Sequence, residues 1–110
     1  MPFDEELARR LRAELANNEG VTERAMFGGM AFLLNGNMCV GVIRDQLVAR
    51  VGPERFGEAV ERLGARTFDL TGRPMSGWVM VRPEGFDSGQ PLAKWVRESL
   101  DYVLTLPPQQ

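Results

Sequence analysis

The chain has 110 residues, and we expect one domain over residues 1–110, with its core at about 5–105 and a flexible tail at 106–110. Its 13 Lys and Arg against 15 Asp and Glu give a formal net charge of −2, which argues against nonspecific nucleic-acid binding because such binding depends on clustered cations. The chain has no histidine, which excludes the usual general base near neutral pH, His-dependent Ser and Cys triads and the commonest metal ligand.

The sequence indicates neither disulfide chemistry nor membrane insertion. Its one cysteine, Cys39, has no second cysteine with which to form an internal disulfide. The N-terminus MPFDEELARR is charged from its fourth residue and does not resemble a signal peptide. No apolar run approaches the roughly 20 residues that cross a bilayer. We therefore expect a cytoplasmic protein that does not contact a membrane.

The first predicted element is an amphipathic helix near the N-terminus. Asp4 can cap this helix, acidic residues in its first turn suit the positive end of the helix dipole, and residues 17–20 form a stop signal. Apolar residues recur every four positions along it, at Phe3, Leu7, Leu11 and Leu15. This spacing predicts a helix that buries one stripe of side chains.

Three apolar stretches of strand length follow the polar residues 22–24. They cover residues 25–27 with 30–34, residues 38–43 and residues 47–51. The dipeptide Asn35-Gly36 is a strong hairpin signal, because a type I′ turn needs positive φ at both central residues. Residues 44–46 form a weaker turn signal. The middle of the chain is therefore predicted to be a meander of antiparallel strands.

A second helix is predicted to begin at Pro53, a residue that suits the first turn of a helix. Phe56, Val60 and Leu63 follow at helical spacing, and Gly64 fits the left-handed position after the helix end. We therefore expect a short helix that ends before Gly64.

The remaining elements complete an α+β fold. Residues 65–70 and 78–82 read as strands separated by a turn at 71–74, and residues 88–91 open a last helix. The predicted order is α-β-β-β(-β)-α-β-β-α, with about five to six antiparallel strands, three helices and the helices packed on one side of the sheet.

The polar face of the last helix carries charges of both signs. Lys94 with Glu98, and Arg97 with Asp101, stand four residues apart. This spacing predicts ion pairs along the helix, each worth a few tenths of a kcal/mol when exposed.

The sulfur-containing residues fit packing better than chemistry. Cys39 lies inside an apolar strand, and we interpret it as a small buried side chain, because nucleophilic cysteines need a cationic or helix-terminal setting. The acids are scattered or lie on helix faces, so we expect no metal site and no cofactor. The methionines expected to fill gaps in the core are Met26, Met30, Met38, Met75 and Met80.

The adjacent glycines Gly28 and Gly29 raise the question of a phosphate-binding loop. A dinucleotide fingerprint or a P-loop would need a characteristic glycine spacing and a following helix, and neither is present. Another strand follows these glycines, so we interpret them as a bend in the sheet.

Several short motifs occur in an order that resembles the TfoX/Sxy N-terminal domain family over about residues 5 to 105. The motifs are Met26-Phe27-Gly28-Gly29, Phe32, Asn35-Gly36, residues 47–51, Gly72-Arg73-Pro74-Met75, residues 78–83, Leu92 and Trp95. The resemblance implies an α+β domain with a curved antiparallel sheet, no known catalytic residues and no cofactor. Two-domain members of that bacterial family regulate natural competence and act with the cyclic-AMP receptor protein on promoters. The signature residues taken as mainly structural are Met26, Phe27, Gly28, Gly29, Asn35, Gly36 and Gly72.

Three hypotheses about function follow. The favoured one is a non-enzymatic regulatory or protein-interaction module whose partner is another protein, with a homodimer through a sheet edge as a further option. The alternative is a DNA-associated transcriptional regulator or co-activator, although the net charge does not support nucleic-acid binding. An enzyme built on carboxylates and arginine is the least favoured. For the alternative, the arginines expected to form a basic face are Arg24, Arg44, Arg66, Arg73 and Arg82.

The candidate interaction surface is the turn that contains Arg73, Pro74 and Met75, together with Trp78. A cation beside a tight turn and an aromatic residue on the following strand are typical contact residues. The competing interpretation is a structural turn followed by a core tryptophan.

Overall fold

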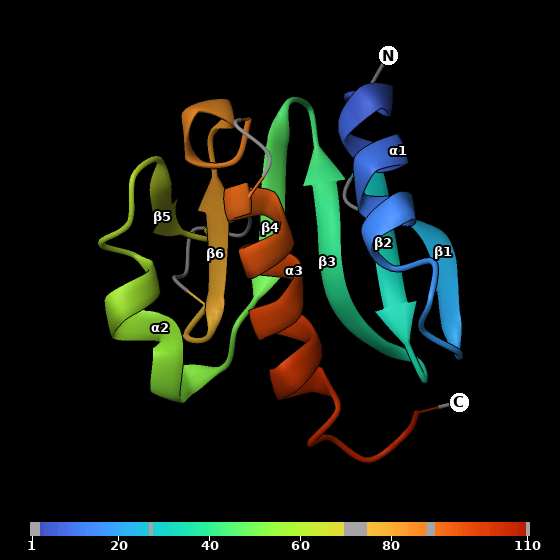
Figure 1. Ribbon diagram of the computed structural model, residues 1–110. Helices are drawn as coiled ribbons and strands as arrows, with labels where there is room; N and C mark the ends of the chain where they lie inside the picture. Colours follow the sequence, from blue (N-terminus) through green and yellow to red (C-terminus); the bar gives the residue numbers. More distant parts are fainter. Residues whose placement is uncertain (1–2, 27, 70–74, 88–89, 110) are drawn as a thin grey trace.

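The computed structural model describes residues 3–26, 28–69, 75–87 and 90–109. These residues form helices α1 to α3, a 3₁₀ turn η1 and one six-stranded antiparallel sheet, which confirms the predicted α+β class and element order (Figure 1). The elements in chain order are α1 Glu5–Glu14, β1 Val21–Met26, β2 Gly29–Leu34, β3 Asn37–Ile43, β4 Gln46–Arg50, α2 Pro53–Ala59, β5 Ala65–Thr67, β6 Trp78–Val81, η1 Pro83–Gly85 and α3 Gln90–Val103.

The sheet is a meander in its first four strands and changes order only at its end. The strand order is β1-β2-β3-β4-β6-β5, so β6 lies between β4 and the edge strand β5. Helix α2 is part of the connection from β4 to β5. It therefore lies beside β5 and β6, while α1 and α3 cross the face of the sheet (Figure 1).

Helix α1 forms as its sequence predicts. The Asp4 carboxylate accepts hydrogen bonds from the backbone N–H groups of Glu6 and Leu7, at 2.9 and 3.2 Å, which satisfies two donors of the first turn. Leu7 and Leu11 are buried against the sheet. The cap and the apolar stripe together fix where the helix begins and which side it turns inward.

Both predicted glycine turns are present. Gly28 has φ +75° between β1 and β2, and a Cβ at Gly29 would lie 2.0 Å from the Val42 carbonyl oxygen. Asn35 and Gly36 have φ of 53° and 85°, as a type I′ turn requires. The Gly28-Gly29 pair is therefore a hairpin turn in which another backbone comes close, and a β-strand follows it.

Strand β1 is longer than its apolar residues indicate. It begins at Val21 and includes the polar residues 22–24, which the sequence pattern placed before the strand. Because β1 is an edge strand with most of its side chains exposed, polar residues are compatible with it.

Cys39 lies at an irregularity in the pairing of β2 with β3. Phe32 pairs with Val40 but Leu33 pairs with Met38, so Cys39 is the extra residue of a β-bulge. Its side chain is buried in the core cluster between the sheet and the helices, as expected for a packing residue.

The sheet has apolar clusters on both faces. The larger cluster lies between the sheet and the helices and includes Leu11, Phe32 and Trp95. The second cluster, which the sequence pattern did not reveal, gathers Phe68 with several methionines. Its methionines are Met26, Met38, Met75 and Met80, while Met30 packs against the larger cluster. The methionines therefore fill both sides of the sheet, as predicted for core residues.

The last residues, for which we expected a flexible tail, make two hydrogen bonds to the β2–β3 hairpin. Gln109 N donates to the Asn35 carbonyl at 2.8 Å, and Asn37 Nδ2 donates to the Pro107 carbonyl at 2.9 Å. The chain end consequently lies beside the hairpin (Figure 1). The domain limits themselves stay a prediction.

The prediction for Leu63 was wrong. Helix α2 ends at Ala59, and Leu63 lies in the following turn with 72% of its surface exposed. Gly64 does have the positive φ expected of it, +77°, but it stands five residues after Ala59, the last residue of the helix. Helical periodicity extended through a turn therefore placed Leu63 in a helix that had already ended.

Candidate functional site

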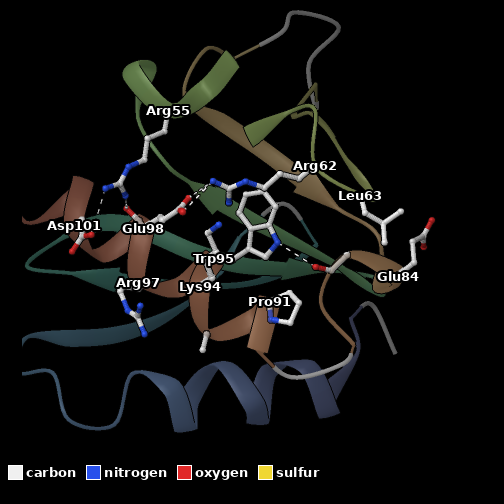
Figure 2. Close-up of a pocket in the computed structure, with 12 residues that line it drawn as sticks. Arg55, Arg62, Leu63, Glu84, Pro91, Lys94, Trp95, Arg97, Glu98 and Asp101 are labelled. Atoms are coloured by element: carbon white, nitrogen blue, oxygen red, sulfur yellow. Dashed lines mark hydrogen bonds and ion pairs between the residues drawn. The ribbon is translucent and has the colours of Figure 1, made fainter. Parts of the chain in front are cut away.

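An open groove of about 900 Å³ lies between α2, the turn after it, η1 and α3 (Figure 2). Its lining combines charged side chains of both signs with an apolar part. The lining residues are Arg55, Arg62, Leu63, Glu84, Gly85, Pro91, Ala93, Lys94, Trp95, Arg97, Glu98 and Asp101. Met75 and Trp78, the described residues of the surface singled out from the sequence, are not among them.

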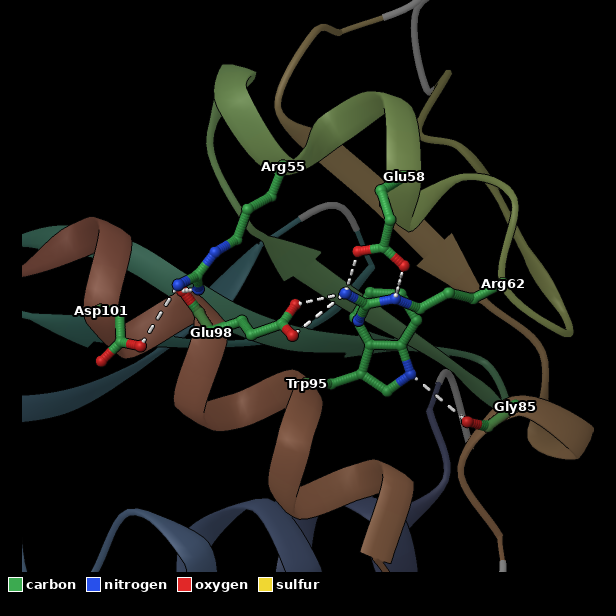
Figure 3. Close-up of polar contacts among 7 residues, drawn as sticks. All are labelled: Arg55, Glu58, Arg62, Gly85, Trp95, Glu98 and Asp101. Atoms are coloured by element: carbon green, nitrogen blue, oxygen red, sulfur yellow. Dashed lines mark hydrogen bonds and ion pairs between the residues drawn. The ribbon is translucent and has the colours of Figure 1, made fainter.

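The centre of this groove is a network around the Arg62 guanidinium. Arg62 Nε donates to Glu58 Oε2 at 2.7 Å, Arg62 Nη2 also contacts Glu58 Oε1, and the same Nη2 donates to Glu98 Oε2 at 3.0 Å (Figure 3). The side chains of Arg62 and Glu98 are 17% and 13% exposed, whereas Glu58 is open to solvent. Arg62 thus joins the end of α2 to α3 through two carboxylates.

Trp95 forms the floor beneath this network. The Arg62 guanidinium lies 4.6 Å from the centre of the Trp95 ring, within the range of a cation–π contact. Trp95 Nε1 donates to the Gly85 carbonyl at 3.3 Å, so the buried indole has its polar atom satisfied. A cation held by two acids and a ring has little freedom to reorient toward a ligand.

Arg62 and Glu58 stay ionised near neutral pH, because their contact shifts the pKa of each group away from neutrality. The hydrogen bonds that Arg62 donates to Glu58 raise the pKa of Arg62 above its usual range, against the opposing effect of burial. The same bond lowers the pKa of Glu58, with smaller contributions from the charges of Arg62, Lys94 and Arg55. Both groups therefore carry their charges across the neutral pH range.

The two ion pairs predicted along α3 are replaced by contacts to α2. Glu98 binds Arg62, and Asp101 lies 3.6 Å from Arg55, whose Nη1 also donates to the Glu98 carbonyl at 3.3 Å. Neither predicted pair within α3 is present. The acids of α3 bind Arg55 of α2 and Arg62 of the turn after it instead of the cations of their own helix.

This exchange leaves two cations of α3 without a salt bridge. Lys94 and Arg97 are exposed and make no hydrogen bond or ion pair with any residue the structure describes. Lys94 still lowers the pKa of Glu58 through its charge. Both side chains line the groove (Figure 2).

A second arginine stack includes one residue of the predicted surface. The Arg50 guanidinium lies 4.9 Å from the centre of the Trp78 ring and 5.6 Å from that of Tyr102. Trp78 also approaches Phe68, with ring centres 6.1 Å apart. Trp78 is half-buried between these contacts, and Met75 packs against the same cluster. Arg73, Pro74 and the signature residues Gly72 and Phe27 lie outside the described residues.

The arginines proposed to form a basic face divide into two groups. Arg44 stands in the β3–β4 turn, and Arg66 Nη2 donates to Oε1 of Gln46, which follows that turn, at 2.6 Å. Arg82 follows the end of β6, next to the pair formed by Leu47 and Val81. These three residues share one end of the sheet, whereas Arg24 lies on the opposite edge strand and Arg73 is outside the described residues.

Among the described residues, the groups to consider for catalysis or metal binding are the Cys39 thiol and the acidic side chains. Burial raises the pKa of the Cys39 thiol to about 12, although the charge of Arg50 opposes this, so the thiol is neutral at physiological pH. Within the described ranges, no group of three or more Cys, Asp or Glu side chains is placed to hold a metal ion. Among the helices seen there, none has the length and apolar character that a bilayer crossing requires.

Sequence reasoning missed this groove. Its residues come from four segments that span the 46 positions from Arg55 to Asp101, and the i,i+4 spacing in α3 pointed to pairs that the fold replaces. No local signal marks the groove, because residues 53–63 carry two arginines among three glutamates and the sequence does not show which cation reaches α3.

Comparison with protein families gives a match, whereas comparison with individual proteins gives none. No curated protein and no solved structure matches the chain. The family model of the TfoX N-terminal domain matches residues 13–103, which is most of the chain and includes both arginine stacks. The match confirms the resemblance seen in the sequence motifs, and the chain therefore belongs to the TfoX N-terminal domain family.

Proposed function

We propose that the chain is a non-enzymatic regulatory module that acts by binding another protein. The supporting observation is the open α2–α3 groove, in which the exposed Leu63 lies at one end and the exposed Lys94 and Arg97 lie further along α3. Cations without a salt bridge to any described residue, and an apolar side chain that a partner can cover, give this groove the mixed chemistry of a protein contact surface. TfoX N-terminal domains are not known as enzymes, which agrees with this proposal.

The arrangement of the acids supports a binding role over a catalytic one. The half-buried acid of the groove, Glu98, is held by an arginine. A general base needs a carboxylate that can exchange its proton near neutral pH. With no histidine in the chain and a neutral Cys39, the groove fits recognition better than proton transfer.

The proposal also covers the location of the protein in the cell and the kind of partner it binds. We place the protein in the cytoplasm, with a different protein as its partner and a homodimer as the competing assembly. The turn around Arg73 and Pro74, with Met75 and Trp78, stays a predicted second contact surface. The Arg50 stack gives Trp78 a packing role as well, so a partner there would meet the edge of the ring.

Affinity capture with two matched leucine variants tests the proposal. The bait is the full chain immobilised in native cell extract, compared with Leu63→Asp and with Leu104→Asp. Leu104 is 60% exposed and does not line the groove, so it controls for the new charge and the lost leucine. We expect a stoichiometric protein on the wild type and on Leu104→Asp, and much less of it on Leu63→Asp. Recovery of no specific protein on the wild-type bait would refute the interaction role.

A second candidate function, a DNA-associated regulator, is favoured by the grouping of Arg44, Arg66 and Arg82 at one end of the sheet. Arginine clusters bind phosphates, and their affinity falls as salt rises because counterions are released. The test is fluorescence anisotropy of a labelled 30-base-pair duplex, with wild type and Arg66→Glu, over a salt series. A DNA affinity that is independent of salt, or equal in both proteins, would exclude this candidate.

A further inference from the structure

We infer that the α2–α3 groove recognises an acidic segment of its partner protein that also carries an apolar side chain. This inference rests on the proposed interaction function and names the chemistry of the ligand. The acidic group of the bound segment contacts Lys94 and Arg97, and its apolar side chain packs near Leu63.

The charge preference follows from which cations are already bound. Arg62 is enclosed by Glu58, Glu98 and the Trp95 ring. It is mostly buried, so it is part of the wall and does not offer a free donor. The cations left for a ligand are the exposed Lys94 and Arg97, whose expected helix partners are bound to α2.

The apolar preference follows from Leu63. Its side chain is largely exposed although it borders Pro91 and the buried Trp95 in the same groove. Covering an exposed leucine removes apolar surface from water, which favours a partner with an apolar side chain at this position. The contact would extend the apolar floor that Trp95 begins.

The two ends of the groove present different side chains, so a ligand should bind in one orientation. Figure 2 shows Leu63 and Glu84 at one end and Arg97 toward the other. Glu98 and Asp101 also stand toward the Arg97 end, but each is bound to an arginine. Glu84 makes no ion pair with a described residue and repels an acidic side chain, so the ligand's acid faces α3 and its apolar side chain faces Leu63. A ligand with the reverse order of these groups would meet Glu84 with a like charge.

The acids in the lining favour a peptide over a polyanion. Glu84, Glu98 and Asp101 line the same groove. A nucleic acid carries a negative charge at every phosphate and would meet these carboxylates wherever it followed the groove. A segment with one or two acids can place them at Lys94 and Arg97 alone.

The first experiment lets the protein select its own ligand. A phage-displayed library of random 12-residue peptides is selected on the folded full chain, and the most enriched sequence is synthesised with a fluorescein label. We expect enriched sequences to combine at least one Asp or Glu with a large apolar residue in a constant order. Enrichment of sequences without acids would overturn the inference.

The second experiment measures that labelled peptide against two double variants by fluorescence polarisation. Lys94→Glu with Arg97→Glu reverses both free cations, and Arg9→Glu with Arg24→Glu makes the same change of charge at exposed residues outside the groove. We expect about tenfold or more weaker binding in the first variant, and a change within about twofold in the second. Equal loss in both variants, or none in either, would contradict the assignment. Circular dichroism confirms that each variant is folded.

Amide chemical shifts separate failure of this inference from failure of the proposed function. Shifts that gather at Leu63, Lys94 and Arg97 on titration with the peptide support the groove. If the peptide shifts only residues elsewhere, the protein still binds proteins but this site assignment is wrong. If no peptide is enriched and affinity capture recovers no specific protein, both proposals fail.

Discussion

Helices α1 and α2 are both joined to a neighbouring element by an arginine–carboxylate contact, but they are attached in different ways. Helix α1 buries three apolar side chains, and its Arg12 reaches Glu23 of β1 at 2.7 Å with exposed fractions of 54% and 34%. Helix α2 buries Ala59 alone, and the network around Arg62 connects its end to α3 out of reach of most solvent. Helix α1 is held by its apolar stripe, whereas α2 combines a smaller apolar contact, through Ala59, Phe56 and Val60, with the network around Arg62.

The difference shows how burial decides what an ion pair contributes. An exposed pair adds about 0–1 kcal/mol because water competes for both charges. A half-buried pair adds little over an apolar substitute, yet removing one partner is costly because the other charge stays desolvated. A helix held by such contacts also leaves polar groups and open space beside it, which is why the groove lies at α2 and not at α1.

The largest expected effect is that of Leu11→Ala in α1. Leu11 is fully buried, so truncation leaves a cavity and should lower the free energy of unfolding by about 2–5 kcal/mol. Urea denaturation followed by circular dichroism measures the change. Leu104→Ala is the matched control and should change stability by less than about 0.5 kcal/mol. Equal losses would show that α1 is not held by its apolar stripe.

The next effect is that of Arg62→Met, which keeps much of the side-chain length but removes the charge. It leaves Glu98 half-buried without its cation and removes the stack on Trp95, so we expect a loss of about 1–3 kcal/mol. Tryptophan fluorescence during urea denaturation reports both stability and the surroundings of Trp95. An unchanged unfolding midpoint would mean that α2 is held by apolar contacts after all.

A smaller effect is expected on acidification. Hydrogen bonds from Arg62 and Arg12 lower the pKa values of Glu58 and Glu23 below the ordinary 4.5. A carboxyl whose folded pKa is lowered stabilises the protein above its unfolded pKa, and this contribution is lost as pH falls through the folded pKa. Thermal unfolding between about pH 6 and 3 should therefore show a falling midpoint below about pH 4.5. Arg62→Met should lose less over this interval than the wild type, and an identical pH dependence would contradict the role of Glu58.

The smallest effect is that of Arg12→Met, the counterpart of the Arg62 substitution on α1. Its pair with Glu23 is exposed, so we expect a loss below about 1 kcal/mol, reduced further in 1 M salt. The ratio of the two losses in unfolding free energy, at Arg62 and at Arg12, measures how much burial changes the contribution of an arginine–carboxylate contact. A loss at Arg12 as large as that at Arg62 would show that burial does not separate the two helices.

Local signals in the sequence were sufficient for most of the fold. The Asp4 cap, the Asn35-Gly36 turn and the bend at Gly28 and Gly29 are set by neighbouring residues, and all were found where the sequence placed them. The polar start of β1 was missed because an edge strand does not need apolar residues. Leu63 was misplaced because periodicity cannot show where a helix has ended.

The sequence by itself determined the α+β class, the hairpins, the family signature and the absence of histidine, because each depends on residue type or on contacts between near neighbours. The tertiary structure alone decided which arginine binds Glu98 and Asp101, and hence that Lys94 and Arg97 form no salt bridge with the part of the chain that the structure describes. It also decided that Cys39 enters the core through a bulge. Charges four residues apart in a helix specify a local contact that is weak, and a better-placed cation from another element displaces it once the chain has folded.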